Sequence, residues 1–182
     1  MKKVLIVFGM LILSTALIAQ KYITKNGHIW FYSETPLEVI EAHNKQVNAA
    51  LDASTGDFVF KVLMKSFEFE KALMQEHFNE NFIESDKFPN STFKGSIVNI
   101  DDMDLTEPGE YEAVVEGDLT IHGVTRKIKQ KGTLKSSGDK IEGRSKFMID
   151  PEDYDIKIPS TVVNKIADEM EVTIDIMLDR LK

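Results

Sequence analysis

Few side chains in this sequence are of the types that carry chemistry. The chain has four histidines and no cysteine, so it forms no disulfide within itself and has no thiol nucleophile or thiolate metal site. It contains no Gly-x-Ser-x-Gly elbow, no phosphate-binding loop and no Gly-x-Gly-x-x-Gly turn. The common hydrolase, nucleotide-binding and dinucleotide-binding chemistries therefore find no support.

Two acidic groups could be considered as metal sites, and neither has the required spacing. Glu76 and Glu80 share a predicted helix face, but His77 lies about a hundred degrees around the helix from Glu76. The acidic run at 101–107 lacks the glycine and the final glutamate of a calcium-binding loop. A solvated helix face and an acidic hairpin loop are the favoured interpretations, and we expect no metal and no cofactor.

His122 has two possible interpretations. It could supply a catalytic or polar group at a rim, or it could be a turn residue before Gly123 that tolerates an unusual backbone conformation. The turn interpretation is favoured. Carboxylates are abundant but alternate onto predicted wet faces, where general acid catalysis has no support. We therefore predict no catalytic residue and a protein that is not an enzyme.

Strands dominate the elements that position these residues. Apolar and polar side chains alternate with a period of two, as in half-buried strands, at 27–34, 46–52, 57–69, 92–100, 111–121, 124–134, 141–149 and 170–179. The stretch at 36–46 could be a helical turn or an irregular strand crossing, and the sequence does not decide between them. No repeat, linker or second domain is evident.

One amphipathic helix interrupts the strands. Leu73, Met74, His77, Phe78, Phe82 and Ile83 recur at three- and four-residue steps, and Pro89 requires the helix to end before it. We expect Phe78, Phe82 and Phe88 to seat this segment over the strands. A second short helix is predicted at 160–167, capped by Ser160 or Thr161.

Eight strands that are each apolar on one face must form a sheet that closes on itself or packs against another layer, so that the apolar face is buried. Eight is also the smallest common barrel size that can hold one small ligand. We predict an all-β fold, an eight-stranded antiparallel lipocalin-like β-barrel with a short capping helix. Small residues at inward positions are expected to leave room inside: Ala113, Gly117, Gly132, Gly143 and Ser145.

Large apolar side chains on the inward faces could line that space. From the residues alone, a ligand channel and an ordinary filled core are equally compatible with them. If a channel exists, the predicted ligand-binding residues are Phe58, Phe60, Met64, Phe67, Phe69, Phe78, Phe82, Leu119, Ile121, Phe147, Val172, Ile174 and Ile176.

The first nineteen residues differ from the rest. Two lysines, an apolar run at 4–13 and a small residue at 19 are typical of a secretory signal peptide, and the run is short for a membrane-spanning helix. We predict a signal peptide at 1–19, a single barrel domain at 20–182, and no stable membrane anchor after cleavage. Cleavage leaves 20 basic against 30 acidic residues, a net charge of −10 that disfavours nucleic acid as a partner.

Two motifs are similar to those of a known family. The segment HFNENFIESDKFPNSTFKG at 77–95 and the hairpin GDLTIHGVTRKI at 117–128 occur in the same order in the YceI-like family, and the resemblance covers about residues 22–182. It implies an extended lipocalin-like barrel with a helical cap. It also implies binding of long amphiphiles, including polyisoprenoids, inside the barrel.

The combined expectation is a periplasmic or secreted protein that sequesters or transports an isoprenoid or acyl amphiphile, as a monomer or homodimer. The polar head is expected near a rim, by His77, His122 or Arg126. Family members often carry an arginine where this chain has Asp150–Ile156 without one, so a head-group role for that arginine does not transfer. The alternatives are a barrel enzyme acting on a lipid, and a ligand-free structural or stress-response module with a filled core.

Overall fold

The computed structural model describes residues 20–181, most of which lie in antiparallel strands. Eight strands are long and one, β4, has only two residues. The strands are β1 (Lys21–Glu34), β2 (Val39–Asp52), β3 (Asp57–Leu63), β4 (Glu68–Phe69), β5 (Asn90–Ile97), β6 (Pro108–Ile121), β7 (Val124–Ser137), β8 (Lys140–Ile149) and β9 (Met170–Arg180).

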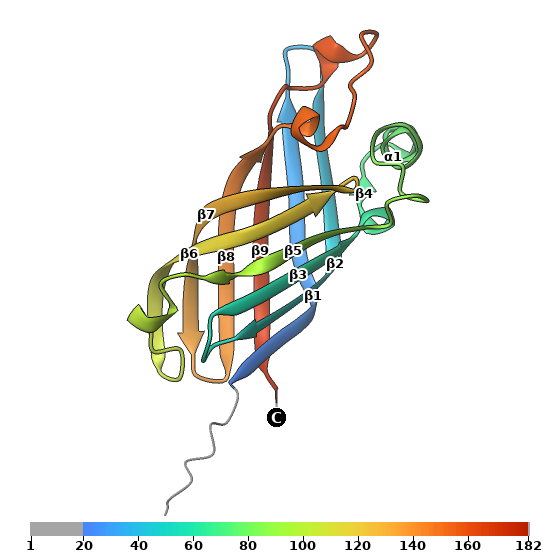
Figure 1. Ribbon diagram of the computed structural model, residues 1–182. Coiled ribbons are helices and arrows are strands. Elements are labelled where there is room, and N and C mark those ends of the chain that lie inside the picture. The colour runs from blue at the N-terminus through green and yellow to red at the C-terminus, as the bar shows by residue number, and fades with distance from the viewer. Residues whose placement is uncertain (1–19, 182) are drawn as a thin grey trace, which may run out of the picture.

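The eight long strands close into a barrel, as predicted (Figure 1). Their order is β1-β9-β8-β7-β6-β5-β3-β2, and pairing of β1 with β2 completes the ring. Closure gives each long strand a neighbour on both sides, although β7 and β8 pair only between Gly132–Ser145 and Ser136–Ile141. The short strand β4 pairs with β2 beyond the end of β3.

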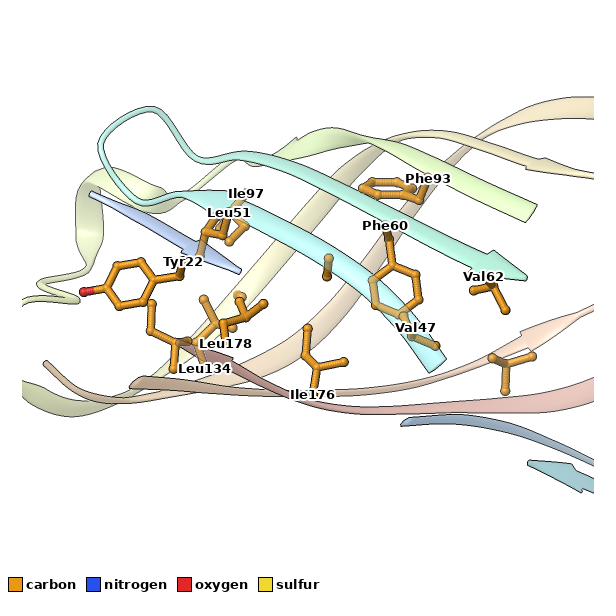
Figure 2. Packing of buried hydrophobic residues seen from close by; sticks show 14 of the residues in the cluster. Tyr22, Val47, Leu51, Phe60, Val62, Phe93, Ile97, Leu134, Ile176 and Leu178 are labelled. Carbon is orange, nitrogen blue, oxygen red and sulfur yellow. The ribbon is translucent and has the colours of Figure 1, made fainter. Parts of the chain in front are cut away.

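One end of the barrel is filled by side chains. Tyr22, Leu51, Ile97, Leu105, Ile141 and Leu178 are almost completely buried there and form what we call the closed-end core. Figure 2 shows Tyr22, Leu51, Ile97 and Leu178 gathered together, with Phe60 and Phe93 farther along the barrel. The Tyr22 hydroxyl donates to the Gly138 carbonyl at 2.7 Å, which satisfies its polar end. Burial raises the pKa of Tyr22.

The helical segment is short and changes character midway. An α-helix, α1 (Ala72–His77), continues directly into a π-helical turn over Phe78–Phe82. Phe78 begins this turn and Phe82 ends it, and both line the barrel interior. Figure 1 places α1 beside the upper end of the barrel, opposite the end where the described chain begins.

Four details differ from the sequence-based expectations or settle them. The predicted helix at 160–167 is wrong: that stretch is mostly turns, with a 3₁₀ turn at Val163–Lys165. The undecided stretch at 36–46 is strand from Val39 onward, and the strand predicted at 57–69 ends at Leu63. Gly117 opens no space, because a Cβ there would lie 2.5 Å from the Gly95 Cα atom where β5 and β6 approach closely.

The predicted signal peptide at 1–19 lies outside the described residues and stays a prediction. Among residues 20–181, no helix is long and apolar enough to cross a membrane.

Candidate binding cavity

A cavity of about 570 Å³ occupies the upper part of the barrel. Its wall is made of inward side chains from the strands, and its cover comes from α1, the π turn and the connection between β8 and β9. All thirteen residues predicted to line a channel do line it: Phe58, Phe60, Met64, Phe67, Phe69, Phe78, Phe82, Leu119, Ile121, Phe147, Val172, Ile174 and Ile176. The volume lies within the range of ligand pockets, about 300–1,000 Å³.

Aromatic rings hold the cover in place. The ring of Phe78, from the π turn, packs against Phe31, Phe67 and Phe69 with centroid separations of 5.7, 5.6 and 5.1 Å. Such tilted and edge-on contacts are the favourable geometries for aromatic pairs. This four-ring cluster connects the cover to β1 and β4, so the helical segment is anchored by apolar contacts.

A second aromatic group lines the wall on the neighbouring strands β3 and β5. Phe58 lies 6.2 Å from Phe60 and 6.1 Å from Phe93, measured between ring centroids. Farther up this wall, the Ser91 hydroxyl contacts the Met64 sulfur at 3.1 Å. The polar atom of this lining serine is therefore occupied within the protein.

The rim carries the charges. Lys71 donates to Glu38 at 2.7 Å, and this hydrogen bond lowers the pKa of Glu38 and raises that of Lys71. His77 and Lys165 are exposed on the same rim, one from α1 and the other from the turn before β9. Leu73 of α1 also lines the cavity and is 61% exposed, so the lining includes residues at the surface on this side.

His122 is both a turn residue and a buried contact. Its φ angle is +50°, and its Nε2 and Nδ1 atoms lie 2.9 Å from Glu84 Oε2 and 3.1 Å from the Tyr154 carbonyl oxygen. Arg126 reinforces the contact by donating to the Asp153 carbonyl at 2.7 Å. The tip of the β6–β7 hairpin thus holds both segments that cover the cavity.

The structure therefore separates the three residues expected near a ligand head. His77 lines the cavity, whereas His122 and Arg126 are outside its lining and bind the covering segments. Phe88, expected to seat the helix over the strands, instead packs edge-on against His122 at 4.4 Å. Burial raises the pKa of the neighbouring Tyr154.

The remaining two histidines meet on the outside of the barrel. His28 Nε2 lies 3.0 Å from His43 Nδ1 across β1 and β2, and the ring of Trp30 stacks on His28 at 4.6 Å. Pattern reasoning missed this pair because the two residues are fifteen positions apart. In the part of the chain that the structure describes, no group of three His, Asp or Glu side chains is arranged to hold a metal ion.

Several lining residues were also missed. Phe31 lies in β1, whose alternation is interrupted by a bulge, and it lines the cavity. Ile40 also lines the cavity, and it lies in the stretch at 36–46 whose structure the sequence did not decide. Gln130 lies in phase with Ile128 and Gly132 on the inward face of β7, so its position in the alternation was the available signal. Gln130 was not predicted to line the cavity because only apolar and small side chains were expected on the inward faces.

Solved structures with the same fold come from several bacteria. A polyisoprenoid-binding domain from Saccharophagus degradans, implicated in plant cell wall breakdown, is 12% identical, with a TM-score of 0.78 over 90% of this chain and 99% of that one. Burkholderia cenocepacia BcnA is 16% identical, with a TM-score of 0.69 over 83% and 95%. The Campylobacter jejuni YceI protein is 16% identical, with a TM-score of 0.57 over 78% and 84%. At these identities the likeness concerns the fold.

No curated protein matches the sequence closely enough to be counted as a relative. The model of the YceI-like domain, however, matches residues 25–178, which span all of the barrel except the first residues of β1 and the last of β9. The two sequence motifs at 77–95 and 117–128 both lie within that match. The chain belongs to the YceI-like family.

Proposed function

We propose that this barrel binds a long-chain apolar or amphiphilic molecule, an isoprenoid or an acyl chain, in its upper cavity. The observation that carries the proposal is a cavity of about 570 Å³ whose barrel wall is lined almost entirely by apolar side chains. A cavity of this size argues against the filled-core module. Family membership supports the same function, and the S. degradans neighbour is described as a polyisoprenoid-binding domain.

The energetics of burial are sufficient for such a ligand. Each buried CH₂ group contributes about 0.8 kcal/mol, so a fifteen-carbon chain gives roughly 12 kcal/mol before costs. Lost translational and rotational freedom and the ordering of the chain reduce this by several kcal/mol. The remainder is compatible with a micromolar or tighter dissociation constant.

Binding, rather than catalysis, is the role we propose for the barrel interior. The charged residues that border the cavity belong to its rim or to the outer face, as the Glu38–Lys71 pair and the exposed Arg144 illustrate. An enzyme acting on a lipid would need a titrating group beside the reacting atoms. We also propose export through the signal at 1–19, so that the protein sequesters or carries its ligand in the periplasm or outside the cell.

Native mass spectrometry of the mature protein, followed by organic extraction of the same sample, tests the proposal. The expected result is a stoichiometric adduct whose extracted component has a long apolar chain. Leu119→Trp, which fills the cavity, should lose the adduct, whereas Asp118→Trp on the outer face of the same strand should keep it. A clean apo mass, together with no thermal shift on adding farnesol or a fatty acid, would contradict the proposal.

A further inference from the structure

We propose that the cavity contains a polar subsite, centred on Gln130 at the seam between β7 and β8, which holds the uncharged hydrogen-bonding end of the ligand. The inference rests on the proposed function and specifies the class of ligand. The apolar lining residues can hold the hydrocarbon part of the ligand, whereas the seam could hold its polar end.

The seam exists because β7 and β8 pair along only part of their length. Their ladder runs from Ser136–Ile141 to Gly132–Ser145 and stops there. Above it, residues 124–131 remain paired with β6, and residues 146–149 remain paired with β9. Figure 1 shows the two strands diverging toward the upper end. Each strand therefore turns a row of backbone N–H and C=O groups toward the seam without a partner strand across it.

Gln130 lies at the point where the seam begins. It follows Ile128 and precedes Gly132 on the inward side of β7, it lines the cavity, and it is only partly buried. Within residues 20–181, the structure assigns its amide no hydrogen-bond partner. Its oxygen and its NH₂ group are therefore available as acceptor and donor for a ligand.

The other inward polar side chains of the barrel wall are already satisfied. Ser145 donates to the Lys131 carbonyl at 2.7 Å, which occupies the first carbonyl beyond the ladder. Ser91, on β5, donates to the Met64 sulfur. Thr92 and Thr133 border the cavity but alternate onto the outer face. Gln130 is thus the polar group that the described wall offers to a ligand.

The charges around the seam indicate that the bound head is uncharged. The nearby cations point outward and are paired: Lys131 with Glu112 at 2.6 Å, Lys129 with Glu116 at 3.3 Å, Lys146 with Glu171 at 2.8 Å, and Arg144 with Asp175 at 3.2 Å. A carboxylate or phosphate at Gln130 would be buried without a counter-ion, which is costly. A hydroxyl, carbonyl or amide would need only the hydrogen bonds that Gln130 provides.

The test compares three probes that share one carbon chain: farnesol, the hydrocarbon farnesene and farnesoate. Each is titrated by calorimetry into the wild-type protein, into Gln130→Leu, which removes the amide, and into Lys127→Leu, a control on the outer face of the same strand and away from the cavity lining. We expect Gln130→Leu to weaken farnesol binding about three- to tenfold and to leave farnesene binding unchanged or tighter. The control should match the wild type for both probes.

A second measurement needs no variant. The side-chain NH₂ resonances of Gln130 should shift on adding farnesol and not on adding farnesene. The subsite is overturned if farnesol binds equally well to the wild type and Gln130→Leu. It is also overturned if farnesoate binds more tightly than farnesol, which would place the head at the rim beside Lys71 and Lys165. Binding of none of the three probes would instead remove the proposed function, and the subsite with it.

Discussion

Asn44 is a polar residue with no exposed surface, and it supports the wall at an irregularity of β2. Its Nδ2 atom donates to the carbonyl of Leu63 at 2.8 Å, and its Oδ1 atom accepts from the backbone N–H of Gln46 at 2.9 Å. Leu63 is the last residue of β3, and the β2–β3 ladder stops at Asn48. The amide therefore supplies the hydrogen bonds that the ladder no longer provides.

Replacement of this amide should be costly. Asn44→Leu leaves the partly buried Leu63 carbonyl and Gln46 N–H without these partners, and we expect the free energy of unfolding to fall by about 1–3 kcal/mol. Asn48→Leu, at an exposed position of the same strand, is the matched control and should change it by less than about 1 kcal/mol. Urea denaturation followed by circular dichroism measures both. If both variants lose the same free energy of unfolding, the hydrogen bonds of the Asn44 amide do not contribute to stability as predicted.

The His28–His43 pair predicts a loss of stability in acid. Burial, the neighbouring His43 and Lys45 lower the pKa of His28 in the folded state, against a smaller opposing effect of Asp175. Below about pH 6.5 the unfolded chain then binds more protons at this position than the folded chain, so stability falls as the pH falls. His28→Gln should lose stability less steeply over that range than the wild type.

The control for this prediction is Asn48→Gln, because Asn48 is exposed on β2 and carries no titrating group. Thermal unfolding measured between pH 5 and 8 should give the same slope for this variant and for the wild type. A His28→Gln slope that is indistinguishable from both would remove the pair as a source of the pH dependence.

At the scale of the elements, alternation was sufficient to predict most of the strands and which of their faces is dry. A period of two fixes the face of every residue in a strand once one is known, which is why the eight predicted lining residues that lie in long strands reach the cavity. The other five reach it from the turns, the short strand β4 and the helical segment between β3 and β5. The helix at 160–167 failed because Pro159 and a Ser-Thr pair suit a turn as well as a helix N-terminus. The closed-end core and the seam depend on pairing across strands, which no local pattern specifies.

Three segments meet at the β6–β7 hairpin tip, each with a residue in the left-handed region: Glu84, His122 and Asp155, with φ angles of 46°, 50° and 55°. Such residues persist only where surrounding contacts hold them. The two ring nitrogens of His122 face oxygen atoms of the Glu84 carboxylate and the Tyr154 carbonyl, at 2.9 and 3.1 Å. The tie between the covering segments is thus polar, unlike the Phe78 cluster.

We expect His122→Asn to loosen the cover without unfolding the hairpin. Asparagine tolerates the left-handed region, so the turn remains while the bonds to Glu84 and Tyr154 are lost. Backbone amides at 82–88 and 151–156 should exchange with deuterium at least several-fold faster, and those of β2 and β9 should not change. Thr125→Ala, on the same hairpin but outside the tie, should leave both covering segments protected. Unchanged exchange at 82–88 in His122→Asn would show that apolar contacts alone hold the cover.

The whole molecule divides into a filled end and a hollow end. The side chains of the closed-end core meet across the full width of the barrel, whereas those around the cavity face empty space on one side. Packing contributes to stability through close contacts on all sides, so a buried side chain at the filled end should contribute more than a similar one at the hollow end. Stability and ligand binding are therefore assigned to opposite ends of the same sheet.

A pair of substitutions in β9 tests this division. Leu178 is fully buried in the closed-end core, and Ile174 lines the cavity four residues earlier on the same face. We expect Leu178→Ala to lower the free energy of unfolding by about 2–5 kcal/mol, because it creates a new void, and to leave the affinity for farnesol unchanged. Ile174→Ala should cost less than about 2 kcal/mol, since it only enlarges an existing cavity, and should weaken farnesol binding. Chemical denaturation measures the free energy of unfolding of both variants, and calorimetry measures their affinity for farnesol. If the two variants lose similar stability and similar affinity, the two ends of the barrel do not have separate roles.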